Sequence, residues 1–280
     1  MTIHLVTDST SQLTTEEINK YDIHIIPLII NDQGKSFKDG IDITSESFLN
    51  DLQTKSEITT TTSQPAVGDF VDLYDELGKD NEPILSIHLT NLLSGTVEGA
   101  FSAASQTESN VTVIDSKLMD RGLGEQVLLA AQLIKEGKTV DEIVAALQEA
   151  HDKKTTDIFF ESLDALQRGG RISKLSGAVS KLLKIKAFIR LFDDELKLMS
   201  KGYGRKFINK TLEKTFSDLN GVKLDTFTLV HVGMNEDRLI EIKELVKTTH
   251  PEADFRVVLT SPIIMNHVGL GTFAFVYSKH

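Results

Sequence analysis

The sequence predicts an α/β protein in two parts, with a mostly parallel sheet in the first part and an α+β arrangement in the second. Before residue 154, short apolar runs alternate with amphipathic segments that carry helix-capping residues. After it, glycines, basic residues and a hairpin pattern interrupt that alternation. Regular alternation is typical of a parallel sheet covered on both faces. We therefore predict an α/β domain over 1–154 and an α+β domain over 155–280, and leave open an exchange of segments between them.

The first domain is predicted to contain four strands separated by helices. The strands are the runs IHLVT (3–7), IHIIPLII (23–30), PILSIHL (83–89) and VTVID (111–115). Pro27 indicates that the second run is an edge strand or is broken, because proline cannot donate to a sheet. Thr14 with Glu17, and Thr139 with Glu142, have the spacing of capping boxes and predict two helix starts.

The second domain has a different pattern. TTDIFFE (155–161) predicts a strand, and LQRGGRISKLSGAVSKLLKI (166–185) predicts a basic helical stretch interrupted by glycines. AFIRLFDDELKLMS (187–200) has the pattern of a hairpin that turns at Asp193 and Asp194. The remaining predicted elements are a helix over 206–219, a strand over 226–232, a helix over 236–249 and a strand over 254–260.

Composition excludes several functions. The formal net charge is −11, which argues against nucleic-acid binding, although basic residues gather between Arg168 and Lys214. No cysteine is present, and no two histidines have the i, i+4 spacing of a helical metal site, so we expect neither disulfides nor a metal. No apolar run is long enough to span a membrane and no signal peptide is visible, which predicts a cytoplasmic protein.

Two enzyme motifs are incomplete. Gly34, Lys35 and Ser36 resemble the end of a phosphate-binding P-loop, but Ile29 stands where that motif needs glycine. A nucleotide cofactor is therefore not expected. Ser94 is followed by Gly95, but Leu92 stands where the G-x-S-x-G motif of hydrolases needs its first glycine.

Two clusters of hydroxyl groups are candidates for binding an anion. In TTTTSQP (59–65), Thr62 and Ser63 precede a predicted helix with Pro65 in its first turn, so that either residue is a candidate N-cap. In LLSGT (92–96), Ser94 and Gly95 stand at a second helix start. Free amides and a partial positive charge at helix N-termini suit a carboxylate or a phosphate. Either cluster alone would be read as an ordinary cap, and the two together indicate a site.

His267 lies in a third candidate segment, NHVGLGT (266–272). A single histidine is often a structural hydrogen-bonding group. Here Gly269 and Gly271 follow it and would allow the backbone to approach a ligand closely. Both interpretations of His267 remain open at this level.

Seven short motifs resemble those of the DegV family, in the same order and over essentially the whole chain. They are VTDST (6–10), FKDGIDIT (37–44), TTSQP (61–65), LSGT (93–96), VIDS (113–116), LQRGGRIS (166–173) and HVGLG (267–271). The resemblance implies a DegV-like fold in which a Rossmann-like N-terminal domain and an α+β domain enclose one long-chain fatty acid. It further implies a non-catalytic subunit of bacterial fatty acid kinase, which presents the carboxylate to a separate ATP-using subunit. That subunit makes an acyl phosphate for phospholipid synthesis.

The resemblance also implies roles for individual residues. Thr62 and Ser94 match positions that hydrogen-bond the carboxylate, and His267 matches a histidine near the head group. The predicted set that surrounds the carboxylate is Thr62, Ser63, Ser94, Gly95, His267 and Gly269. The fatty acid is the expected ligand, with no metal and no further cofactor.

Two arginines are predicted to contact the kinase partner or the phosphate. Arg171 matches a family arginine near the mouth of the pocket. Arg205 lies close to the position where other family members have an Arg-Thr pair, which this chain lacks. The chain departs from the family pattern at Ala187, at 202–205 and at Leu270. These departures keep open an alternative function as a fatty acid carrier or sensor without phosphoryl transfer. A hydrolase that uses Ser94 and His267 is a third alternative.

Overall fold

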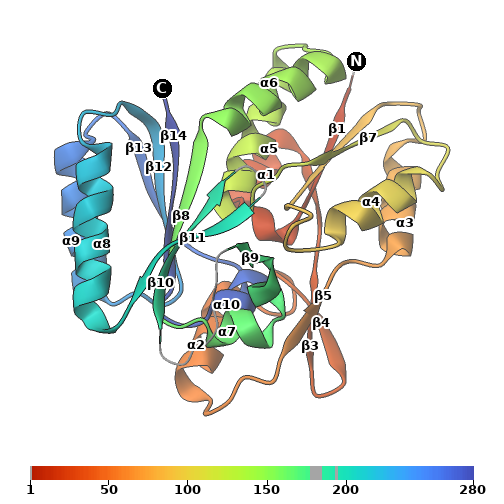
Figure 1. Ribbon diagram of the computed structural model, residues 1–280. Coiled ribbons are helices and arrows are strands. Elements are labelled where there is room, and N and C mark those ends of the chain that lie inside the picture. The colour runs from red at the N-terminus through yellow and green to blue at the C-terminus, as the bar shows by residue number, and fades with distance from the viewer. Residues whose placement is uncertain (1, 177–184, 193–194) are drawn as a thin grey trace. The chain divides into compact units, whose positions relative to one another are not determined.

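The structure is a computed structural model that describes residues 2–176, 185–192 and 195–280 (Figure 1). The chain forms two units, each with its own sheets and core. Unit 1 contains the residues up to Thr44, Thr59–Asp152 and Ser261–Ile263. Unit 2 contains Ser45–Ile58, Lys153–Thr260 and Ile264–His280.

Unit 1 is built on a four-stranded sheet in the order β2-β1-β6-β7, and every neighbouring pair is parallel. The strands are β1 (His4–Asp8), β2 (Ile23–Ile26), β6 (Ile84–His88) and β7 (Val111–Asp115). All five residues of β6 are buried, as expected for a central strand covered on both faces. The prediction of a parallel sheet in the first domain is confirmed.

Helices cover both faces of this sheet (Figure 1). They are η1 (Ser9–Ser11), α1 (Thr15–Tyr21), α3 (Val67–Leu77), α4 (Thr96–Ala104), α5 (Asp120–Lys135) and α6 (Val140–Asp152). Phe70 and Tyr74 of α3 pack with Ala100 of α4 against Val6 of β1. The capping box of Thr14 and Glu17 is formed, and Thr139 and Glu142 exchange the same pair of bonds before α6.

A three-stranded antiparallel sheet completes unit 1. It contains β3 (Ile29–Asp32), β4 (Lys35–Lys38) and β5 (Thr61–Ser63), in the order β4-β3-β5. The run over 23–30 is broken at Pro27 into β2 and β3, and β2 lies at the edge of its own sheet. Both alternatives predicted for Pro27, an edge strand and a break in the strand, are therefore found in the structure.

Unit 2 contains a mixed sheet in the order β13-β12-β14-β8-β10-β11-β9. Its strands are β8 (Lys154–Phe160), β9 (Leu175–Ser176), β10 (Lys186–Phe192), β11 (Glu195–Gly202), β12 (Leu224–His231), β13 (Asp254–Leu259) and β14 (Phe273–Lys279). Strands β10 and β11 pair antiparallel, which confirms the predicted hairpin, while the predicted turn at residues 193 and 194 lies outside the described residues.

The helices of unit 2 include α8 (Gly204–Leu219) and α9 (Glu236–Thr249), which cover one face of the sheet (Figure 1). Between them and the sheet lies an aromatic core in which the ring centroids of Phe159 and Phe273 are 4.7 Å apart. Two further helices, α2 (Ser45–Thr54) and α7 (Asp164–Arg168), are shorter. The chain also forms η2 (Arg171–Lys174) and α10 (Pro262–Val268).

The predicted helical stretch over 166–185, interrupted by glycines, is confirmed in part: residues 166–168 belong to α7 and residues 171–174 form η2, whereas residues 175–176 form a strand. Helix α7 ends at Arg168, and the chain continues through η2 into the short strand β9. The reason is Gly170, whose φ of 74° lies in the left-handed region and ends the helix. Residues 177–184 lie outside the described residues. In the part of the chain that is described, no helix combines the length and the apolar character needed to cross a membrane.

Candidate functional site

Thr62 and Ser63 lie on a strand and do not cap a helix, so the prediction of either residue as an N-cap is wrong. Thr62 pairs with Ile30 in the small sheet of unit 1. Helix α3 begins only at Val67, and its N-cap is Ala66, whose amide donates to the Asp69 carboxylate at 3.3 Å. Pairing between distant strands has overridden the local capping pattern. The Thr62 side chain consequently lies on a half-buried strand position.

Ser94 and Gly95 lie at the start of α4, as predicted. Gly95 is the N-cap, and the Ser94 hydroxyl is 2.9 Å from the Thr96 hydroxyl. Ser94 Oγ also accepts a hydrogen bond from the Thr96 amide at 3.3 Å. Ser94 is half-buried and Thr96 fully buried. The arrangement leaves a small hydroxyl and a helix N-terminus at the end of the loop that follows β6.

Gln64 brings the two hydroxyl clusters of unit 1 together. A Cβ atom added at Gly95 would lie 2.2 Å from Gln64 Oε1, and one added at Gly99 would lie 3.3 Å from Gln64 Nε2. The segment that carries Thr62 therefore packs against the start of α4, where only glycine leaves room for it. Sequence reasoning did not single out Gln64, although its place directly after Ser63 was a signal.

A buried chain of polar groups supports the loop that leads to Ser94. The Asp8 carboxylate is fully buried and accepts hydrogen bonds from the Thr10 hydroxyl at 2.6 Å and from the Leu89 amide at 2.9 Å. His88 Nδ1 lies 3.1 Å from the same carboxylate, and its Nε2 lies 2.7 Å from Ser86 Oγ. This order resembles a catalytic triad, but all three side chains are inaccessible. Its role is to fix the first residue of the loop over 89–95.

Asp39 is a second buried carboxyl group in unit 1. Burial raises its pKa to about 7, and the nearby charge of Asp8 adds to this effect. Hydrogen bonds from the Ser9 hydroxyl, at 2.6 Å, and from the Ile263 amide oppose it. Asp39 therefore exchanges a proton near neutral pH. It lies in the motif FKDGIDIT, but its burial depends on distant segments that the sequence pattern does not reveal.

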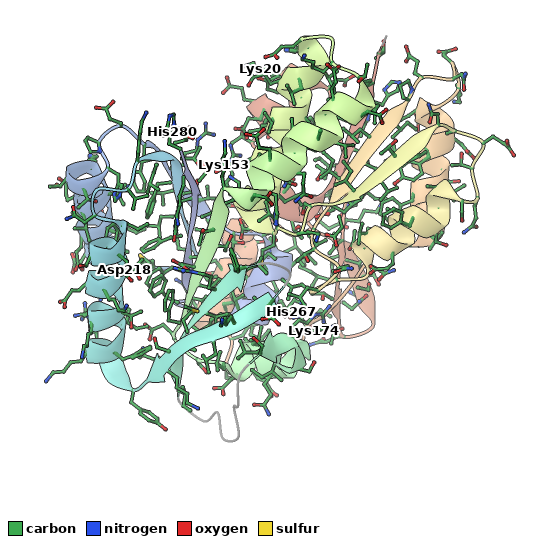
Figure 2. All side chains as sticks on the ribbon, turned by 45° about the horizontal axis from the view of Figure 1, so that its top comes forward. Lys20, Lys153, Lys174, Asp218, His267 and His280 are labelled. Atoms are coloured by element: carbon green, nitrogen blue, oxygen red, sulfur yellow. The ribbon has the colours of Figure 1, made fainter. Side chains whose placement is uncertain are left out.

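In unit 2, His267 and Gly269 pack against the glycine-rich segment that carries Arg171. His267, labelled in Figure 2, lies near the end of α10. A Cβ atom at Gly169 would lie 2.1 Å from His267 Nδ1, and one at Gly269 would lie 3.1 Å from the Ala165 methyl group. Gly269 also has a φ of 79°, which favours glycine.

The electrostatics of this segment keep His267 neutral. Burial, together with the smaller effect of the charges of Arg171 and Arg168, lowers the pKa of His267 to about 4. Arg171 Nη1 donates to the Gly169 carbonyl at 2.8 Å, and partial burial lowers its own pKa. A neutral imidazole donates one hydrogen bond and accepts one, so His267 can bind a carboxylate without carrying a charge.

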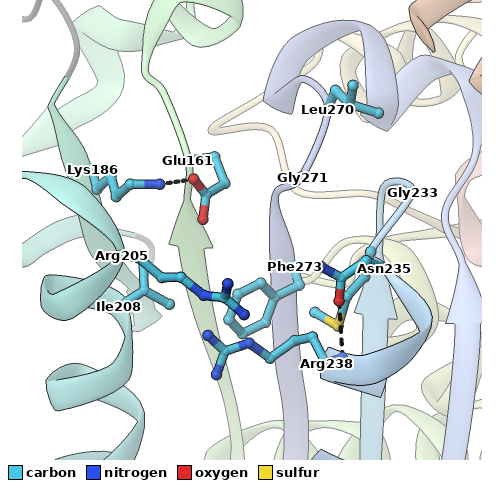
Figure 3. A pocket seen from close by; sticks show the side chains of 11 residues that line it. Glu161, Lys186, Arg205, Ile208, Gly233, Asn235, Arg238, Leu270, Gly271 and Phe273 are labelled. Atoms are coloured by element: carbon cyan, nitrogen blue, oxygen red, sulfur yellow. Dashed lines mark hydrogen bonds and ion pairs between the residues drawn. The ribbon is translucent and has the colours of Figure 1, made fainter. Parts of the chain in front are cut away.

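Arg205 does not share the surroundings of His267, although Leu270 and Gly271 of the same segment line one pocket with it. It belongs to the first turn of α8 and lines an open pocket of about 510 Å³ within unit 2 (Figure 3). Neither His267 nor Arg171 lines that pocket. The two arginines predicted to share a role therefore belong to different surroundings. Among the residues that the structure describes, no group of three or more histidine, aspartate or glutamate side chains could hold a metal ion.

Comparisons with known proteins agree on one family. A family model described as "Uncharacterised protein, DegV family" matches residues 2–280. A DegV domain-containing protein of Staphylococcus aureus (strain MRSA252) is 37% identical over 279 residues, which is 98% of each chain. The crystal structure of DegV, a fatty acid binding protein from Bacillus subtilis, covers 100% of both chains with a TM-score of 0.87 and 29% identity.

A second solved structure gives the same result. It is described as fatty acid binding of a DegV family protein from Thermus thermophilus, and it has a TM-score of 0.87 at 28% identity. It also covers 100% of both chains. Both solved structures therefore have the same fold as this chain.

Proposed function

Because this chain belongs to the DegV family, we propose that it binds one long-chain fatty acid through its carboxylate and presents that carboxylate to a separate ATP-dependent kinase subunit. The observation that carries the proposal is the packing of Gln64 against Gly95, which brings the hydroxyl segments of unit 1 together. The similar proteins from Bacillus subtilis and Thermus thermophilus, described as fatty acid binding, support the ligand class.

The hydroxyl groups suit a carboxylate for a physical reason. A carboxylate that leaves water loses much of its solvation free energy unless hydrogen-bond donors replace the water. Hydroxyl and amide donors to an ionised acceptor form short, strong bonds. In the proposed complex Thr62, Ser94 and the Gly95 amide provide these donors, with Ser63 beside them. His267 adds a neutral imidazole donor near the head group, with the backbone at Gly269 close by.

The acyl chain would supply most of the affinity. Each buried methylene group contributes about 0.8 kcal/mol, so a long chain binds tightly and is released slowly. Slow release suits a protein that hands its ligand to a partner. In the proposed system the partner transfers a phosphoryl group to the bound carboxylate, and this chain performs no catalysis. The proposed setting is the cytoplasm, where the acyl phosphate enters phospholipid synthesis.

Mass spectrometry of the organic extract from freshly purified protein tests the ligand. We expect a fatty acid in about equal amount to the protein, since a site saturated during expression retains its ligand. An empty extract, together with no uptake of added palmitate or oleate, would contradict fatty acid binding.

A double variant tests the two hydroxyl groups. Thr62→Ala with Ser94→Ala removes two donors to an ionised group, and we expect the fatty acid Kd to rise about 100-fold. The matched control is Thr61→Ala with Ser102→Ala, two exposed hydroxyls on the same elements β5 and α4. Equal affinity of the double variant and the parent would place the carboxylate elsewhere.

Presentation to a kinase is tested separately. Protein loaded with fatty acid is mixed with the ATP-binding subunit of the same organism and ATP, and acyl phosphate is measured. Formation of acyl phosphate, reduced by Arg171→Gln or Arg205→Gln, would support the assigned contacts of these arginines. Failure with a loaded protein would favour the carrier or sensor function. The exposed Leu270, at a position that departs from the family pattern, is the observation that favours this second candidate.

A further inference from the structure

Unit 2 contains a pocket that the proposed carboxylate site does not use. It lies where β8 and β12 end and where β14, α8 and α9 begin, at one edge of the large sheet (Figure 3). Both β8 and β12 run antiparallel to β14, so their carboxyl ends meet at this edge. The volume of about 510 Å³ is that of a small-molecule site. Charged and apolar side chains line it, among them Glu161, Lys186, Arg205, Ile208, Arg238 and Phe273.

Two arginines point into the same part of this pocket (Figure 3). Arg238 is only 9% exposed, and its guanidinium group is held by Asn209 Oδ1 at 2.5 Å and Glu241 Oε2 at 3.1 Å. These contacts orient Arg238 before any ligand arrives. Arg205 comes from the neighbouring helix and, within the described part of the chain, forms no ion pair. Its positive charge is therefore available to a ligand.

The other charged side chains of the pocket do not neutralise Arg205. Lys186 forms an ion pair with Glu161, so that the charges of these two side chains compensate each other (Figure 3). Glu241 neutralises part of the charge of Arg238. The pocket is thus positive in a protein whose formal net charge is −11. Two guanidinium groups that line one pocket repel each other, and an anion between them would remove that repulsion.

One wall of the pocket is apolar. The Phe273 ring lies beside the two guanidinium groups in Figure 3, and Ile208 of α8 lies on the same side of the pocket. Leu270, which is 44% exposed, precedes β14 in the sequence and also lines the pocket. Cations and apolar side chains that lie next to each other suit a ligand with an anionic group and a small organic part.

We propose that this pocket binds a phosphate group between Arg205 and Arg238, carried by a small organic ester or present as the free anion. Guanidinium groups form paired hydrogen bonds with phosphate oxygens, and arginines on two elements can contact two edges of the same tetrahedral group. The inference rests on the proposed function only in assigning Arg205 to a phosphate, because the pocket belongs to unit 2 alone.

Calorimetric titration of the full chain with inorganic phosphate, phenyl phosphate and benzoate tests the site. The salt concentration is kept at about 25 mM so that screening is weak. We expect both phosphates to bind and benzoate to bind at least about tenfold more weakly, since phosphate carries more charge and more acceptors. Tighter binding of phenyl phosphate would assign the site to an ester, whereas equal affinities would assign it to the free anion.

Variants on α8 separate a built site from general attraction. Arg205→Gln is expected to raise the phosphate Kd about tenfold, whereas Lys206→Gln, an exposed neighbour with the same charge change, should alter it less than about twofold. Arg238→Gln should weaken binding as Arg205→Gln does, with its melting temperature measured to confirm folding. Equal effects of Arg205→Gln and Lys206→Gln, or no saturable phosphate binding, would overturn the proposal.

The titration also separates this proposal from the proposed function. It contains no kinase subunit, nucleotide or added fatty acid, so its failure would leave fatty acid binding and presentation standing. An empty lipid extract, in turn, would leave the phosphate titration unaffected.

Discussion

The two units bury negative charge in different ways. In unit 1, the fully buried Asp8 carboxylate is surrounded by backbone amides, a hydroxyl group and an imidazole ring. In unit 2, the equally buried Asp157 carboxylate receives two hydrogen bonds from the Arg190 guanidinium group, at 2.6 and 2.8 Å. The Tyr277 hydroxyl adds a third bond at 3.1 Å. One carboxylate is thus held by amides, a hydroxyl group and an imidazole ring, and the other by a guanidinium group that carries a full positive charge.

The same difference extends to the two candidate sites. Thr62 and Ser94 in unit 1 offer neutral donors, whereas Arg205 and Arg238 in unit 2 offer cations. Dipoles at fixed positions distinguish ligands by geometry, and their strength depends little on ionic strength. Cations attract any anion and are weakened by salt. The two proposed sites would therefore differ in their response to salt: binding at the hydroxyl groups of unit 1 would change little with ionic strength, and binding at the arginines of unit 2 would weaken.

Removal of Arg190, the ion-pair partner of Asp157 in unit 2, should have the largest effect on the free energy of unfolding. Arg190→Ala leaves Asp157 buried without its cation, and we expect the free energy of unfolding to fall by about 4 kcal/mol. Urea unfolding of the parent and the variant measures this. Adding Asp157→Asn to Arg190→Ala should restore part of the loss, because the uncompensated charge is then gone. A loss below about 1 kcal/mol would mean that Asp157 does not depend on its cation.

The second largest effect concerns pH and Asp39. Since the folded pKa of about 7 lies above the ordinary value of 3.8, the folded protein keeps a proton that the unfolded chain releases as pH rises. The contribution of Asp39 to stability is complete below the ordinary pKa and is lost as pH rises to about 7. Asp39→Asn removes this dependence. We expect the stability of the variant relative to the parent to rise by on the order of 3 kcal/mol from about pH 4 to about pH 8.

Urea unfolding at both pH values measures the Asp39 effect. Asp72→Asn, an exposed change in the same unit, is the control for the removal of one carboxylate. A stability difference between Asp39→Asn and the parent that stays constant with pH would contradict the raised pKa of Asp39.

A smaller effect is expected at Gly169. Gly169→Ala places a methyl group against His267, and the imidazole must move, at a cost of about 2 kcal/mol. The displaced ring should also become more hydrated, so NMR titration should show its pKa rising from about 4 toward the ordinary 6.5. Gly68→Ala, where the added methyl group meets no atom within 4 Å, is the matched control. An unchanged titration of His267 would contradict the close packing.

The smallest effect belongs to the dipoles of unit 1. Thr10→Val keeps the shape of the side chain and removes one hydroxyl donor to Asp8, while the Thr10 and Leu89 amides remain. We expect a loss of about 1 kcal/mol in the free energy of unfolding. The ratio of this loss to that of Arg190→Ala measures the difference between the two units directly. Equal losses would remove the distinction.

Local patterns predicted much of the fold. Both capping boxes, the parallel strands of unit 1 and the hairpin of β10 and β11 follow from neighbouring residues and were found in the structure. The capping role of Thr62 and Ser63 failed because Thr62 pairs with Ile30, far away in the sequence. Asp39 and the pocket at Arg238 could not be foreseen, since each depends on contacts between distant segments. For Gln64 the only signal was its place directly after Ser63, and its packing against Gly95 could not be predicted from that place. Sequence patterns identified the hydroxyl groups of unit 1 but did not predict the packing of Gln64 against Gly95 that brings their segments together.

The division of the chain into units has a consequence for biosynthesis. Unit 1 includes Ser261–Ile263, and the Ile263 amide is one of the donors to Asp39. A ribosome adds residues at about 5–20 per second, so this donor emerges many seconds after the strands of unit 1. The nascent N-terminal segment therefore waits for nearly the whole polypeptide before Asp39 gains all its partners. Premature termination anywhere before residue 261 would leave both units without residues that belong to them.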